Sequence, residues 1–123
     1  MSKKDKEKAA TAIAAGRVAI GASAYLAPNL SGRLFGLDPD GNPQASYLGR
    51  LFGARDVALG AGVLRSPRKQ KDAWVAAGMA CDVADVGAGA LAGIRGTLPP
   101  SAAAMVTATA AFFALTSAYL LQQ

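Results

Sequence analysis

Four stretches of membrane-spanning length divide the chain and constrain its fold more than any other feature. They run from about 9 to 27, 45 to 64, 73 to 94 and 101 to 121. A helix needs about 20 residues to cross the hydrocarbon core of a bilayer. The sequence therefore predicts an all-α fold, a bundle of four transmembrane helices. Residues 1–8 form a basic tail, and residues 9–123 form a single membrane domain.

The composition favours lipid over water as the solvent of this bundle. Apolar residues make up 52% of the chain, but most of these are Ala, while 14 residues are Gly and only 7% are aromatic. Large side chains that could fill a soluble core are therefore scarce. Small residues, in contrast, let helix backbones approach closely in a membrane. A soluble domain stays the alternative.

Charged residues interrupt three of the four segments, and only the fourth is free of them. Each central Arg or Asp costs about 2.5 to 3.5 kcal/mol on membrane-insertion scales. Since paired charges cost much less to bury than single ones, we expect these segments to be stable only as a bundle. Three positive and three negative side chains form the predicted intramembrane polar network: Arg17, Arg50, Arg55, Asp56, Asp82 and Asp85.

Glycines share helix faces with the carboxylates of this network. At 100° per residue, the glycines of segment two fall within about 60° of Asp56, and those of segment three follow the stripe of Asp82 and Asp85. Because glycine admits a close neighbour, these stripes predict helix–helix interfaces with buried polar groups. The predicted packing glycines are Gly49, Gly53, Gly60, Gly78, Gly89 and Gly93.

Partners within the network are harder to assign from the sequence. Arg17 lies on the small-residue face of segment one, and Asp82 and Asp85 are spaced to hold one guanidinium together, that of Arg17 or of Arg55. Arg55 falls on another face than the glycines. Either the bundle therefore covers two faces of segment two, or a second copy of the chain covers Arg55. In segment four we expect one face toward lipid: Met105, Phe112, Phe113 and Leu120.

The connections predict the orientation of the bundle. The N-terminal tail and the second connection together hold eight Lys and Arg residues, whereas the first and third hold only Arg33 and Arg95. By the positive-inside rule, both termini are cytoplasmic. The start of the chain superficially matches a secretory signal, but its apolar run is almost all Ala and contains Arg17, so we interpret it as a retained helix.

The first connection, residues 28–44, is the only long one. It contains Gly32-Arg33-Leu34-Phe35-Gly36, and the same five residue types recur at 49–53. We expect a short interfacial helix here, with Leu and Phe in the headgroup region and Arg33 near phosphates. Residues 37–43 are typical of an exposed turn.

The sequence lacks the residues that several classes of function require. With no His and a single Cys, Cys81, the chain holds no internal disulfide, zinc cluster or Cys–His pair, and we expect no metal and no cofactor. The net charge of +5 comes from short basic clusters without interleaved aromatics, so we expect no nucleic acid. No nucleophile or phosphate-binding loop accompanies the carboxylates, so we expect no enzyme.

The stretch from Tyr47 to Gly60, with Gly49-Arg50-Leu51-Phe52-Gly53-Ala54-Arg55-Asp56, resembles a segment of small four-helix bacterial membrane proteins of actinobacterial type. These proteins are grouped as a domain of unknown function. Residues 33–37 and 82–85 also fit that pattern. The resemblance implies a multi-pass protein of the bacterial plasma membrane, with recurrent Arg and Asp residues and no established activity.

Two functions remain for the polar network. Buried ion pairs can fix the register of helices without transport or catalysis. This favours a non-enzymatic protein, either a self-associating homo-oligomer or an accessory subunit of a larger membrane complex, with the lipid bilayer as its constant partner. Alternatively, intramembrane charges mark the path of an ion, a proton or a polar ligand. The alternative is therefore a small transporter or channel-like protein.

Overall fold

The structure is a computed structural model that describes residues 1–122. Within this range it contains five helices and no strand. The helices are α1 (Lys3–Leu26), α2 (Pro28–Leu34), α3 (Ala45–Arg65), α4 (Arg68–Arg95) and α5 (Pro100–Leu121). The all-α prediction is confirmed.

The prediction of four transmembrane helices is wrong. Among the five helices of residues 1–122, three are long and apolar enough to cross a membrane, namely α1, α4 and α5. Helix α3 is long enough, but every stretch of 18 residues within it contains Arg50, Arg55 and Asp56. The sequence prediction weighed length and the small-residue stripe above these three charges, and it therefore counted one span too many.

Proline and glycine set the boundaries between helices. Pro28 is the first residue of α2, where its missing N–H is not needed, and Pro67 stands between α3 and α4. Helix α4 ends at Gly96, whose φ of 74° closes a left-handed cap. There the N–H of Thr97 donates to the carbonyl of Ala92 at 3.0 Å.

Helix α1 begins inside the basic tail. The Ser2 hydroxyl accepts a hydrogen bond from the N–H of Asp5 at 3.1 Å and caps the helix. Hydropathy located only the apolar part of this helix, from about residue 9. Lysine and glutamate are good helix formers, so the helix extends to Lys3.

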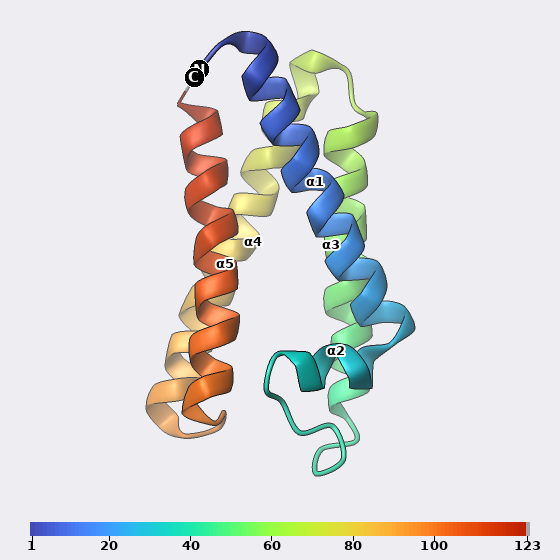
Figure 1. The fold of residues 1–123 in the computed structure, drawn as a ribbon, viewed down its shortest axis with the longest axis vertical. Coiled ribbons are helices and arrows are strands. Elements are labelled where there is room, and N and C mark those ends of the chain that lie inside the picture. The colour runs from blue at the N-terminus through green and yellow to red at the C-terminus, as the bar shows by residue number, and fades with distance from the viewer. Residues whose placement is uncertain (123) are drawn as a thin grey trace.

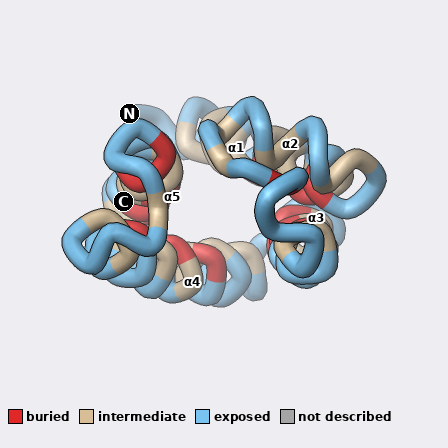
Figure 2. The backbone as a smooth tube through the Cα atoms, turned by 90° about the horizontal axis from the view of Figure 1, so that it is seen from below, coloured by how far each residue is buried: buried red, intermediate tan, exposed pale blue. Residues whose placement is uncertain are grey.

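The four long helices form two antiparallel pairs, α1 with α3 and α4 with α5 (Figure 1). Packing is extensive within each pair and much sparser between them. Seen along the helices, the two pairs stand on opposite sides of the molecule (Figure 2). Both ends of the described chain lie at one end of the bundle, because α3 and then α5 return the chain to the end where α1 began (Figure 1).

The first connection contains α2, which confirms the predicted short helix. Leu30 and Leu34 of α2 are exposed. Arg33 forms an exposed ion pair with Asp40 at 3.0 Å. The turn that follows is fixed by Asp38, whose Oδ1 accepts from the N–H of Gly41 at 3.1 Å.

The bundle holds its small side chains inside and many of its large apolar ones outside. Six of the nine buried apolar residues are Ala, whereas Ile94, Leu26 and Leu115 are 84%, 79% and 72% exposed. Such an exposed apolar surface is suited to lipid. The hydroxyls of Thr109 and Thr116 each donate to a carbonyl of their own helix at 2.8 Å, so they need no water. These features support membrane association.

Candidate functional site: a buried arginine–aspartate network

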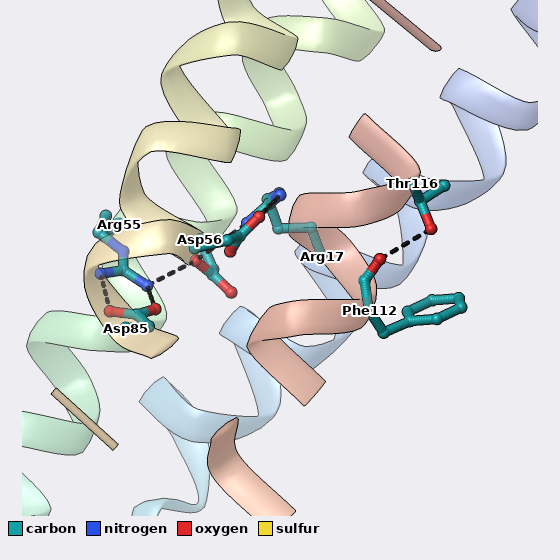
Figure 3. Close-up of polar contacts among 7 residues, drawn as sticks. Arg17, Arg55, Asp56, Asp85, Phe112 and Thr116 are labelled. Carbon is teal, nitrogen blue, oxygen red and sulfur yellow. Dashed lines mark hydrogen bonds and ion pairs between the residues drawn. The ribbon is translucent and has the colours of Figure 1, made fainter. Parts of the chain in front are cut away.

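Five charged side chains from three helices form one cluster, and Figure 3 labels four of them, Arg17, Arg55, Asp56 and Asp85. Helix α1 contributes Arg17, α3 contributes the adjacent Arg55 and Asp56, and α4 contributes Asp82 and Asp85. The two α4 carboxylates are three residues apart and so lie on one face of the helix. This group is called the Arg/Asp network below.

The most buried link of the network joins α1 to α4. Arg17 donates from both terminal nitrogens to Asp82, from Nη1 to Oδ1 at 3.0 Å and from Nη2 to Oδ2 at 2.6 Å. The two side chains are only 6% and 5% exposed. Such a two-bond pair is both strong and directional.

Two neighbours complete the surroundings of Arg17. The Cζ atom of Arg17 stands 5.1 Å from the ring centroid of Phe113 on α5, a cation–π contact. On the α4 side, a Cβ atom on Gly78 would lie 3.0 Å from Nη2 of Arg17. The guanidinium therefore lies against the bare backbone of α4, which only glycine provides at that position.

The second link joins α3 to α4 and is less buried. Arg55 donates to both oxygens of Asp85, at 3.1 and 2.6 Å. The side chains of Arg55 and Asp85 are 32% and 30% exposed. The Cζ atom of Arg55 also stands 4.9 Å from the ring centroid of Phe52, one helical turn earlier.

Asp56 connects the two links. Its Oδ1 lies 3.3 Å from Nη2 of Arg55 and 3.7 Å from Nη1 of Arg17. In Figure 3, Asp56 stands between the two arginines. Asp82, Arg17, Asp56, Arg55 and Asp85 thus follow one another in an alternating chain of charges.

Arg50 lies outside this chain. Its Nε donates to the backbone carbonyl of Tyr25, near the end of α1, at 3.1 Å. No carboxylate of residues 1–122 lies within 4.0 Å of its guanidinium nitrogens. Arg50 therefore ties α3 to a free carbonyl at the end of α1 and does not balance the network's charge.

The expected sharing of one guanidinium by Asp82 and Asp85 is wrong. Each carboxylate holds its own arginine, Asp82 that of α1 and Asp85 that of α3. Arg55 is paired within the chain. A second copy of the chain is therefore not needed to cover the charge of Arg55.

The predicted packing glycines lie at helix contacts. Cβ atoms on Gly53 and Gly60 would run into the backbone of α1, and one on Gly49 would meet Pro28. On α4, Gly89 and Gly93 lie against Thr107 and Ala103 of α5, and Gly78 lies against Arg17. Gly21, on the small-residue face of α1, meets Gly53. One further close contact was not predicted: Gly62 of α3 meets the ring of Trp74.

The face of α5 that the sequence predicts toward lipid is exposed only in part. Met105 and Phe112 are exposed as expected, but Leu120 is only 2% exposed and Phe113 contacts Arg17. The predicted lipid face placed Phe113 and Leu120 outward, which is wrong. Both turn toward the α1 side of the bundle.

Beside Arg17 the bundle leaves little space. A small, partly open cavity of about 10 Å³, room for about one water molecule, is lined in part by Ala14, Trp74, Gly78 and Ser117. The network's chemistry is thus that of tightly held ion pairs. Cys81 lies within α4 next to Asp82 and is not disulfide-bonded.

Comparison of the chain with protein-family models, with curated proteins and with solved structures gives no match. The resemblance of residues 47–60 to the four-helix bacterial proteins therefore stays a prediction.

Proposed function

We propose that the protein is a non-enzymatic integral membrane protein of the bacterial plasma membrane, in which the Arg/Asp network locks the two helix pairs together. It serves as a self-associating bundle or as an accessory subunit of a larger complex. One observation carries the proposal: both two-bond ion pairs cross from the α1/α3 pair to α4.

The energetics of buried ion pairs support a lock. Packing between the two helix pairs is sparse, so directional bonds are needed to fix their relative position. Removing one partner of a buried pair costs about 3 to 5 kcal/mol, because it leaves an uncompensated charge. That is a large share of a typical folding free energy of about 5 to 15 kcal/mol.

Charges outside the network support an orientation in which both termini of the bundle face the cytoplasm. The basic tail and the turn between α3 and α4 lie at the same end of the bundle, since Glu7 near the start of α1 pairs with Arg68 at the start of α4. The more basic end is the end that holds the N-terminus, and α2 lies at the other (Figure 1). By the positive-inside rule the basic end faces the cytoplasm.

The second candidate is a small transporter or channel-like protein that uses the network as its polar path. The observation that favours it is the connection of five ionisable groups, three buried and two half-buried, in one chain. The cavity of about 10 Å³ beside Arg17 is too small for a permanently open pore. A transport cycle would therefore require the two helix pairs to move apart.

The substitutions Asp82→Asn and Asp85→Asn, singly and together, separate the two candidates. If the network is a lock, each variant accumulates less folded protein in the membrane, and the double variant least, because Arg17 and Arg55 lose their partners. The measurement is the amount of monodisperse protein after detergent extraction. The matched control is Asp40→Asn, which removes the exposed pair with Arg33 and should cost less than about 1 kcal/mol.

The same variants give distinct results for a transport path. Normal accumulation with loss of ion or proton flux in proteoliposomes would support the transporter and contradict the lock. Normal accumulation with unchanged flux would contradict both candidates.

A further inference from the structure

The charges of the Arg/Asp network do not balance. It contains two guanidinium groups, Arg17 and Arg55, and three carboxylates, Asp56, Asp82 and Asp85. With every group ionised, two positive and three negative charges leave one negative charge in the interior. The sixth predicted member, Arg50, cannot neutralise it, because its side chain bonds to the Tyr25 carbonyl.

Asp56 is the carboxylate without a partner of its own. Asp82 and Asp85 each receive two hydrogen bonds from one arginine, whereas Asp56 receives a single one at 3.3 Å, from a nitrogen that also serves Asp85 at 2.6 Å. Its Oδ2 accepts no hydrogen bond from residues 1–122. Yet Asp56 is only 5% exposed, so water does not solvate it freely.

The groups around Asp56 limit what can neutralise it. Arg17 faces it from α1, Arg55 from its own helix and Asp82 from α4. Asp85 and Cys81, also on α4, interact with Arg55. Helix α5 carries no charged residue. A lone buried charge is costly enough that an ionisable group takes up or loses a proton instead.

A metal ion fits this site poorly. Two guanidinium groups lie within 4.0 Å of Asp56 and would repel a cation. No group of three or more His, Cys, Asp or Glu side chains in residues 1–122 is arranged to hold a metal ion. Sodium also prefers several oxygen ligands, and the other carboxylates are already occupied by arginines.

We propose that Asp56 is a buried proton-binding site, neutral at physiological pH, which leaves the network as two intact ion pairs and one carboxylic acid. A hydronium ion of the solvent supplies the proton: one of its O–H bonds breaks as the O–H bond at the free Oδ2 forms, and a water molecule is released. The network is then electrically neutral. Loss of this proton introduces a single negative charge between the two helix pairs.

Infrared spectroscopy of the full chain in detergent or nanodiscs tests this assignment. At neutral pH the wild-type protein should show the carbonyl stretch of a neutral carboxylic acid, with the small shift that deuterium exchange produces. The Asp56→Asn variant should lack this band, and Asp40→Asn should keep it. A wild-type spectrum without the band, or a band that persists in Asp56→Asn, would overturn the proposal.

Stability supplies the second readout. Asn has the shape of a neutral carboxylic acid, so Asp56→Asn should unfold at the wild-type temperature or higher, whereas Asp82→Asn should unfold at a lower one. An ionised Asp56 that bridges both arginines would instead make Asp56→Asn as damaging as Asp82→Asn, which overturns the assignment. If Asp82→Asn left stability unchanged while the infrared band was present, the proposed structural role of the network would be contradicted and the proton-binding site at Asp56 would still be supported.

The pH dependence has a defined sign. An unfolded aspartate loses its proton near pH 4, so above that pH the folded protein holds one proton more than the unfolded chain. Stability therefore falls as pH rises: the equilibrium constant for unfolding increases by up to tenfold per pH unit, until Asp56 of the folded protein ionises too. The Asp56→Asn variant should lack this contribution. Replacing sodium by choline in the buffer should leave the stability of the protein unchanged. Stabilisation that depends on sodium would show that a sodium ion neutralises Asp56, and it would overturn the proposal of a bound proton.

Discussion

Replacing Arg17 by Met is expected to lower the free energy of unfolding by about 3 to 5 kcal/mol. The substitution keeps an unbranched side chain of similar length but leaves Asp82 buried, 5% exposed, without the two hydrogen bonds at 3.0 and 2.6 Å. It also removes the contact of the guanidinium with Phe113. Denaturant titration in detergent micelles, followed by circular dichroism, measures the loss.

The double variant Arg17→Met with Asp82→Leu provides the control. Replacing both members of a buried ion pair by apolar residues of similar volume is often neutral or stabilising. The double variant should therefore recover most of the stability that each single variant loses, which gives a strong coupling energy in a double-mutant cycle. Additive effects of the two substitutions would show that the pair does not act as a unit.

Replacing Gly53 by Ala should lower the free energy of unfolding by about 1 to 3 kcal/mol, the usual cost of overpacking. A Cβ atom at Gly53 would stand 2.7 Å from the backbone nitrogen of Tyr25 and would overlap the carbonyl oxygen of Gly21. Because these are backbone atoms, α1 and α3 would have to separate. The measurement is the thermal midpoint of the extracted protein.

Gly87 offers a matched control for Gly53 on another long helix. Nothing lies within 4 Å of a Cβ atom built at Gly87. Since Ala is a better helix former than Gly by up to about 1 kcal/mol, Gly87→Ala should be neutral or stabilising. Equal losses at Gly53 and Gly87 would contradict the close α1–α3 contact.

Residue patterns within single helices predicted much of this arrangement. The stripe of Asp56 with Gly53 and Gly60 lies against α1, and Gly89 and Gly93 lie against α5. Such stripes are informative because a buried charge and a close backbone contact each require a face away from lipid. That demand is visible in one helix alone.

Features that depend on two helices at once could not be predicted in this way. The choice of Asp82 for Arg17 and Asp85 for Arg55 depends on where α1 and α3 stand relative to α4. Phe113 is apolar and looks suited to lipid, yet it covers Arg17. Only the neighbouring guanidinium gives that ring a reason to face inward.

The assumption that the buried charges balance led to the wrong membership of the network. Counting Arg50 with the network made three charges of each sign, but helix periodicity alone does not show that its side chain reaches the end of α1. Helix α3 was misjudged for a related reason. Its three charges near the middle disqualify it as an apolar span, although its glycines pack as expected.

Membrane fractionation tests the central claim most directly. Cells that express the full chain are lysed, and their membranes are washed with alkaline carbonate and then extracted with detergent. We predict that the protein stays in the membrane pellet through the carbonate wash and is released only by detergent, because α1, α4 and α5 are long and apolar enough to cross the bilayer. Recovery of the folded protein from the cytosol without detergent would contradict the account.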